Sequence, residues 1–377
     1  MNRNLLFIAI ALFTWGIGEG MFFNFQPIYL AELGSDPQEI GFILGAFGAA
    51  MAVTHIPAGH LADRLGRRPL LVSAWTMGLL STLVMAMARD LPLFVVGMLG
   101  YGLTAFVASP LSSYTTAARG NWSVARVLTL TTATFNLGMV LGPVTGGWIG
   151  DRFGLRSVYF VAAAIFLVST AVIVLIENQP RDQHDPESPP PGLLSNPRLL
   201  GFLGVYAFAV LAMYLPVPLT PNFLEGVRGL SLTQTGIIFT AGALGNALLA
   251  IFMGRFSPRL GFPLSQAMVG LFFLLIWRGA GLPVFALAYF LLGGFRAARP
   301  MAMAEARALV HDSQMGLTYG TMETIASIIF IIAPPLAGFI FERDPMALYP
   351  LGIGLVVLSI LVSVIFAPRA SLQESSA

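Results

Sequence analysis

The chain has 377 residues, 56% of them hydrophobic and only 10% charged, a composition that excludes an ordinary soluble globular protein. The formal net charge is +2, and all 20 cationic side chains are arginines spread through short gaps between apolar segments, a distribution that argues against a nucleic-acid-binding surface. The absence of cysteine excludes disulfides, thiol catalysis and cysteine-bound metals.

Apolar segments long enough to cross a membrane recur along the whole chain. About 20 apolar residues cross the hydrocarbon layer as a helix, and clusters of charged residues, glycine and proline separate these segments from one another. The N-terminal segment lacks a small-residue cleavage pattern, so we expect it to be retained as the first span. The sequence therefore predicts an all-α integral membrane protein with twelve transmembrane helices, at residues 5–31, 38–61, 69–88, 91–114, 123–149, 157–176, 199–224, 232–254, 262–281, 283–304, 315–341 and 347–366.

One polar stretch separates the first six spans from the last six. Residues 179–197 include a run of prolines and charged residues that has neither the apolar content to span a membrane nor the periodicity to pack. We predict a flexible cytoplasmic linker here. It joins an N-terminal six-helix bundle at 1–178 to a C-terminal six-helix bundle at 198–377.

The two predicted bundles resemble each other in sequence. Gly59 and Gly66 recur as Gly254 and Gly261 at one common offset. An internal repeat of this kind predicts two pseudo-symmetric bundles with a solute site between them, near the middle of the membrane. If the N-terminus is cytoplasmic, 12 of the 20 arginines fall on the cytoplasmic side and 6 in outer loops. We therefore expect a multi-pass protein of the inner membrane with both termini in the cytoplasm.

A loop between the second and third spans carries a recognisable motif. It reads Gly-His-Leu-Ala-Asp-Arg-Leu-Gly-Arg-Arg from Gly59 to Arg68 and matches, position for position, the signature G-x-L-A-D-R-x-G-R-R of the major facilitator superfamily. The chain resembles this superfamily over essentially its whole length, which implies the major facilitator fold and transport by alternating access. The matching positions with an expected role are Gly59, Asp63, Arg64, Gly66, Arg67 and Arg68.

The resemblance implies that this signature loop latches the two halves in the outward-facing state. Asp63 is then expected to pair with a basic residue at the inner end of the fourth span, for which Arg119 is available. The alternative is that the arginine cluster only holds the loop at the anionic cytoplasmic face and so fixes the topology.

The fifth span contains a second element, in which glycines recur at spacings of four around a proline. It resembles the G-x-x-x-G-P-x-x-G-G element of drug/proton antiporters, which implies an exporter; the alternative is a packing and kink device with no influence on direction. Such exporters usually carry an arginine in the fourth span, whereas no arginine lies between Arg89 and Arg119 here. This departure puts proton coupling through that residue in doubt. The residues of the element are Gly138, Gly142, Pro143, Gly146 and Gly147.

Four acidic or arginine side chains fall inside predicted spans and away from the span ends. Each is a candidate site residue, because a charge in the hydrocarbon layer is costly unless it is paired or hydrated. Glu19 lies near the middle of the first span and shares one helical face with Trp15, Phe22 and Gln26. We hypothesise that Glu19 alternates between binding a proton and binding the solute, because burial disfavours its charged form. The alternative is a permanently paired, structural Glu19. The four residues are Glu19, Arg296, Arg299 and Glu323.

The other three charged residues lie in adjacent predicted spans. Glu323 can neutralise either Arg299 or Arg296 in an ion pair. Alternatively, one arginine stays free to bind a carboxylate or phosphate group of the solute. In the fifth span, Thr132 and Asn136 share a face and could hydrogen-bond a solute, although hydroxyl groups in apolar helices more often bond to their own backbone.

We therefore predict a secondary transporter that works by alternating access, with proton-coupled efflux of small amphipathic organic molecules as the first choice. The alternative is an organic anion transporter that uses Arg296 and Arg299. A membrane-embedded lipid enzyme and a non-transporting sensor are more remote, because neither a clustered nucleophile and base nor a signalling domain is seen. The other residues expected at the cavity are Trp15, Glu19, Phe22, Gln26, Tyr101, Thr132, Asn136, Tyr206, Met213 and Glu323.

The sequence also limits the cofactors and partners. It contains no metal-ligand cluster and no phosphate-binding loop, so we expect no metal, no cofactor and no nucleotide, with the proton gradient as the energy source. We expect the partners to be a small-molecule solute and the lipid bilayer, with no nucleic acid, and the protein to act as a monomer.

Overall fold

The structure is a computed structural model that describes residues 3–178, 196–310 and 315–366, without the side chains of 55–65, 109, 124–125 and 315–317. All regular secondary structure in these ranges is helical. Eleven helical segments there are long and apolar enough to cross a membrane, by length and composition, and a further helix, α3 (Pro37–Leu65), occupies the position predicted for the second span. The all-α membrane fold predicted from the sequence is therefore confirmed.

Both halves of the chain follow the predicted spans closely. The first half contains α1 (Arg3–Phe22), α2 (Gln26–Glu32), α3, α4 (Arg67–Met87), α5 (Leu91–Leu103), α6 (Ala108–Ala117), α7 (Val124–Phe153) and α8 (Leu155–Val174). The second half contains α9 (Pro197–Tyr214), α10 (Thr220–Asn222), α11 (Leu232–Met253), α12 (Pro258–Arg278), α13 (Leu282–Arg307), α14 (Met315–Arg343) and α15 (Leu348–Phe366). The predicted linker lies outside the described residues except at its end, where α9 begins.

Three of the predicted spans are interrupted by a tight turn of backbone just before a proline. Proline has no N–H group to donate, and its ring clashes with the carbonyl one helical turn earlier, so the regular helix gives way there. As a result the first, fourth and seventh spans each consist of two pieces. The turns and their prolines are Phe23–Phe25 with Pro27, Thr104–Val107 with Pro110, and Val217–Leu219 with Pro221.

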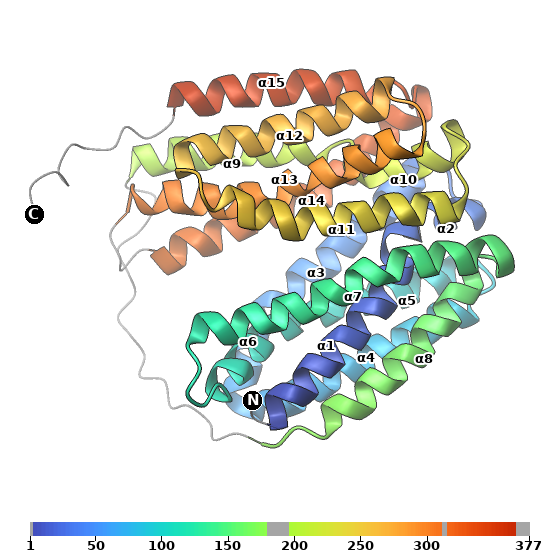
Figure 1. Cartoon of the computed structure of the whole chain (residues 1–377), viewed down its shortest axis with the longest axis vertical. Coiled ribbons are helices and arrows are strands. Elements are labelled where there is room, and N and C mark those ends of the chain that lie inside the picture. Colours follow the sequence, from blue (N-terminus) through green and yellow to red (C-terminus); the bar gives the residue numbers. More distant parts are fainter. Residues whose placement is uncertain (1–2, 179–195, 311–314, 367–377) are drawn as a thin grey trace, which may run out of the picture.

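Figure 1 shows the helices of the first half on one side of the molecule and those of the second half on the other. Both described chain ends, the start of α1 and the end of α15, lie at the same end of the helices. We call this end the terminus face and the opposite one the far face. Between the halves, α3 packs against α14 and α7 packs against α11.

Buried hydrogen bonds hold the helices of each half together. In the first half, the Trp75 indole donates to Ser169 at 2.9 Å and Ser169 donates to the Ala11 carbonyl at 2.7 Å, which joins α4, α8 and α1. In the second half, Gln266 of α12 bonds to Ser359 and Ser363 of α15 at 2.8 and 2.9 Å. Polar groups that cannot reach water must be paired in this way.

Small residues let α1 and α7 approach until their backbones touch. A Cβ atom on Gly138 would lie 2.8 Å from the Gly16 carbonyl carbon, and one on Gly142 would lie 2.6 Å from the Gly20 Cα. Glycine at these positions is therefore required by the space available. The close contact fixes the position of α1, which carries Glu19.

Candidate functional site

A cavity of about 560 Å³ lies between the two halves. The first half contributes side chains from α1 and α3–α7, and the second half from α11 and α13. Its wall extends from the middle of the helices toward the terminus face, where it includes Ser112 of α6 and Thr131 of α7. Glu19 and Arg296 are the acidic and the basic side chain among the described residues that line it.

The far face is closed by contacts of α7 with α11. Asp151, near the end of α7, accepts hydrogen bonds from the backbone N–H groups of Leu232 and Thr233 at 2.9 and 2.7 Å. Gly147 of α7 lies directly against the Leu232 carbonyl, and Gly236 of α11 against Pro143. The exporter-like glycine element thus faces both α1 and α11.

A second set of far-face contacts joins α3 to α14 and the first span to the seventh. Gly41 of α3 lies against the Pro334 carbonyl, and Gly338 of α14 against Pro37. The Asn222 amide donates to the Pro27 carbonyl at 2.8 Å. In the described part of the chain, hydrogen bonds between the halves lie in the far-face portion of the helices. We place the opening of the cavity at the terminus face, because its wall extends in that direction.

Glu19 is held in the cavity by two neutral donors. The Tyr101 hydroxyl donates to Glu19 Oε2 at 2.7 Å, and the Trp15 indole N–H lies 3.1 Å from the same oxygen and 3.1 Å from the Tyr101 oxygen. Trp15 sits one helical turn before Glu19, as the shared face predicts. Its ring stacks on Phe166 with centroids 3.9 Å apart, which fixes the indole against the inner wall of the first half.

Arg296 reaches the same cavity from α13, in the opposite half. It is exposed to the cavity and, within the described part of the chain, forms neither a hydrogen bond nor an ion pair. Its charge and that of Glu19 are close enough to interact electrostatically, but the two side chains are not in ion-pair contact.

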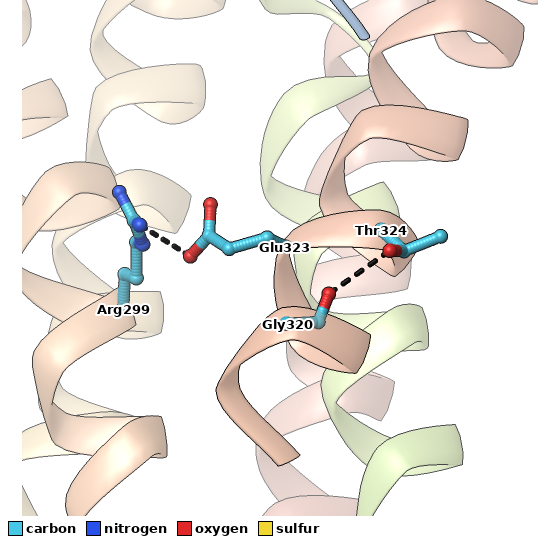
Figure 2. A network of polar contacts seen from close by, with 4 residues as sticks. All are labelled: Arg299, Gly320, Glu323 and Thr324. Atoms are coloured by element: carbon cyan, nitrogen blue, oxygen red, sulfur yellow. Dashed lines mark hydrogen bonds and ion pairs between the residues drawn. The ribbon is translucent and has the colours of Figure 1, made fainter. Parts of the chain in front are cut away.

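Arg299 forms an ion pair with Glu323 that joins α13 to α14 (Figure 2). The two side chains are 55% and 43% exposed, so the pair is half hydrated rather than buried in the bundle. Thr324 next to it bonds to its own backbone, at Gly320, over 2.9 Å. Of the two ion pairs that the sequence left open for Glu323, this is the one formed, and Arg296 is the arginine left without a carboxylate.

Among the other predicted cavity residues, Trp15, Tyr101, Thr132 and Asn136 also line the cavity. The Thr132 hydroxyl donates to its own backbone, at the Leu128 carbonyl, over 3.0 Å.

Six residues predicted at the cavity are not among the residues that line it. Two of them, Arg299 and Glu323, form the ion pair described above. The other four are at most 2% exposed, namely Phe22, Gln26, Tyr206 and Met213. Phe22 packs among aromatic rings of its own half. Gln26 leaves the face of Glu19 because α1 ends at Phe22 and the tight turn that follows changes the direction of the side chains. Tyr206 and Met213 point into the packed interior of the second half.

Sequence reasoning missed two polar residues of the second half that line the cavity, Asn246 of α11 and Tyr289 of α13. An isolated amide within an apolar span was the available signal for Asn246. Tyr289 carried no comparable signal, because buried tyrosines occur throughout this chain.

The signature loop is described only in part. Gly59, Asp63 and Arg64 lie in the segment whose side chains the structure does not describe, so the expected contact between Asp63 and Arg119 lies outside the described residues as well. Gly66 caps the start of α4 with φ at +89°, a conformation that favours glycine. Arg68 donates to the Val174 carbonyl at 2.9 Å, and Arg67 and Arg119 line a surface pocket at the terminus face.

Comparisons with known proteins match the chain over its whole length. The profile described as Major Facilitator Superfamily matches residues 8–264 and 202–376. The quinolone resistance protein NorA of Staphylococcus aureus (strain MSSA476) is 24% identical over 404 residues, which cover 100% of both chains. The multidrug resistance protein MdtG of Escherichia fergusonii is 27% identical over 282 residues, or 69% of this chain and 67% of that protein.

A solved structure with the same architecture is a mutant form of the nucleoside transporter NupG. It superposes with a TM-score of 0.84 over 97% of this chain and 100% of that one, at 14% sequence identity. At this identity the likeness shows the fold alone.

Proposed function

Because the chain belongs to the Major Facilitator Superfamily, and is a membrane transporter of small-molecule solutes rather than an enzyme, we propose that it exports small amphipathic organic molecules in exchange for protons. It works by alternating access, in the inner membrane, with both termini in the cytoplasm. In that orientation the conformation described above is open to the cytoplasm and closed on the outside.

The observation that carries the proposal is the setting of Glu19. It is the acidic side chain among the described cavity residues, and its hydrogen-bond partners, Tyr101 and Trp15, are neutral donors. Because Glu19 forms no ion pair with any residue that the structure describes, it can take up a proton without breaking one. A proton and the cationic group of a solute then compete for the same carboxylate, and this competition couples their opposite movements.

The wall of the cavity suits an amphipathic solute. Aromatic and other apolar side chains from both halves surround the few polar groups of the cavity. These apolar side chains include Phe135, Phe239 and Met139. Such walls accept apolar bodies of varied shape. The names of NorA and MdtG, which refer to quinolone and multidrug resistance, support export of this class of molecule.

The energy source, the oligomeric state and the latch of the transporter are proposed from the sequence. The proton gradient supplies the energy without a cofactor, and the protein acts as a monomer. Asp63 and Arg119 latch the outward-facing state, in which the terminus face is closed.

A second candidate function rests on Arg296. A guanidinium group that is exposed to the cavity and lacks a carboxylate partner suits an organic anion. Transport of anions that is lost in Arg296→Gln and independent of Glu19 would favour this candidate.

Proton flux in proteoliposomes tests the first candidate. Internal pH is recorded while a lipophilic aromatic cation is added under an imposed proton gradient, for the wild type, Glu19→Gln and the matched control Glu39→Gln. Glu39 is exposed at the start of α3, on the far face, so its replacement changes charge without touching the cavity.

We expect the solute to drive proton flux in the wild type and in the control, and not in Glu19→Gln. Proton flux that persists in Glu19→Gln contradicts the role of this residue. Solute movement without proton flux in all three proteins contradicts proton coupling.

A further inference from the structure

The cavity presents one acidic and one basic side chain that do not form an ion pair with each other. Glu19 comes from α1 in the first half and Arg296 from α13 in the second, and they are not in ion-pair contact. Arg299 does not alter this balance, because Glu323 neutralises it. Glu19 accepts hydrogen bonds only from the neutral donors Tyr101 and Trp15, and Arg296 has no hydrogen-bond or ion-pair partner in the described part of the chain.

When a solute displaces water from the cavity, its charges decide whether Glu19 and Arg296 each gain an oppositely charged partner. A cation neutralises Glu19 but leaves Arg296 uncompensated, and an anion does the reverse. A charge that loses its water without gaining a partner is costly in an apolar cavity. A solute with an ammonium group and a carboxylate compensates both side chains at once, and the guanidinium group of Arg296 can bind the carboxylate through two parallel hydrogen bonds.

The wall near the two charges is aromatic. Trp15 lies beside Glu19, and Tyr289 lies two helical turns from Arg296 on α13. The cavity volume of about 560 Å³ falls within the range of small-molecule sites, roughly 300–1,000 Å³. The space therefore suits one solute with an aromatic body and two charged groups.

We propose that the preferred solute is an aromatic zwitterion whose ammonium group binds Glu19 and whose carboxylate binds Arg296. The inference rests on the proposed function, since it names the class of solute for the same cavity. Because the two side chains belong to opposite halves, the bound zwitterion bridges them. A solute with a single charge engages one half only, so the zwitterion also promotes closure of the terminus face and is transported faster.

Two sets of matched solutes test the proposal. One set is naphthylalanine, its methyl ester and its N-acetyl derivative; the other is aminomethylbenzoic acid with the same two derivatives. Each ester is a cation and each N-acetyl compound an anion, and the aromatic body stays the same. The separation of the charges differs between the sets. Binding to the purified full-length protein is measured by calorimetry, and turnover by counterflow in proteoliposomes.

We expect at least one zwitterion to bind about tenfold more tightly than its ester and its N-acetyl derivative, the size of one charge-assisted hydrogen bond. Arg296→Gln removes the advantage over the ester, and Glu19→Gln the advantage over the N-acetyl compound. The esters should bind to Arg296→Gln at least as tightly as to the wild type, because no charge is left uncompensated, and such binding shows that this variant is folded. Arg278→Gln, at the far-face end of α12, is the surface control.

Equal binding of zwitterion and ester by the wild type in both sets overturns the proposal, and so does a preference that survives in Arg296→Gln. If the esters still drive proton flux through Glu19 in that case, the proposed function stands and only the zwitterion assignment fails. If a zwitterion preference is found without proton flux from any solute, the assignment stands and proton coupling fails.

Discussion

The two hydrogen bonds that Asp151 accepts across the halves predict how strongly this carboxylate favours the conformation with the far face closed. Asp151 of α7 accepts hydrogen bonds from the Leu232 and Thr233 N–H groups, both in the first turn of α11. The first N–H groups of a helix have no partner within the helix, and their partial positive charge attracts an anion. The contact crosses between the halves, so it must break when the far face opens.

The magnitude follows from the kinds of interaction lost. Asp151→Asn keeps the size of the side chain but removes its charge and one of its two acceptor oxygens. Helix capping contributes about 0.5–2 kcal/mol, and a charge at a helix N-terminus about 0.3–1 kcal/mol. Because Asp151 is exposed, we expect a loss of about 1–2 kcal/mol, which shifts the ratio of far-face-closed to far-face-open molecules about 5- to 30-fold.

The chain contains no cysteine, so two introduced cysteines can be spin-labelled uniquely. We place them at Met87 and Ala280, exposed positions in opposite halves near the far face, and measure the distance distribution by double electron–electron resonance. The matched control is Asp90→Asn, because Asp90 accepts the Leu93 N–H at 3.0 Å within its own half. The longer-distance population should increase in Asp151→Asn only. An unchanged distribution, or an equal shift in the control, would refute the reasoning.

Two further predictions concern the packing between helices. Gly147→Ala places a methyl group against the Leu232 carbonyl between the halves, so it should raise the longer-distance population of the spin-label pair. Gly245→Ala places a methyl group within the second half. It should lower the free energy of unfolding by about 1–3 kcal/mol and leave the distance distribution unchanged. In a double-mutant cycle on detergent-solubilised protein, Arg299→Ala and Glu323→Ala should show a coupling energy of about 0.5–1 kcal/mol, because the ion pair is half hydrated; strictly additive effects would contradict the pair.

The fold was predictable because membrane spans are encoded locally. An apolar segment of fixed length needs no partner to be recognised, so the predicted ranges follow the helices closely. The helix interruptions near Pro27 and Pro110 also have a local cause, but each changes which side chains share a helical face beyond the interruption. Once α1 ends at Phe22, helical spacing no longer relates Gln26 to Glu19, and the expected shared face is lost.

The choice between the two arginines could not be made from the sequence. Arg296 and Arg299 are three residues apart on one helix, so the periodicity places both on the same side. Which of them meets Glu323 depends on the position of α14 along α13, which is a property of the assembled bundle. Tyr206 and Met213 were selected by residue type alone, and residue type does not indicate which side of a helix faces a cavity.

The close contacts between the halves at the far face are made largely by glycines against backbone carbonyls, as at Gly41, Gly147 and Gly236. These surfaces fit together because glycine has no side chain, whereas solute recognition in the cavity depends on the side chains that line it. A mutation that enlarges a cavity residue is therefore expected to change solute binding and to leave the far-face contacts intact. Single substitutions in the cavity can thus change which solutes bind, while the glycine contacts that close the far face stay the same.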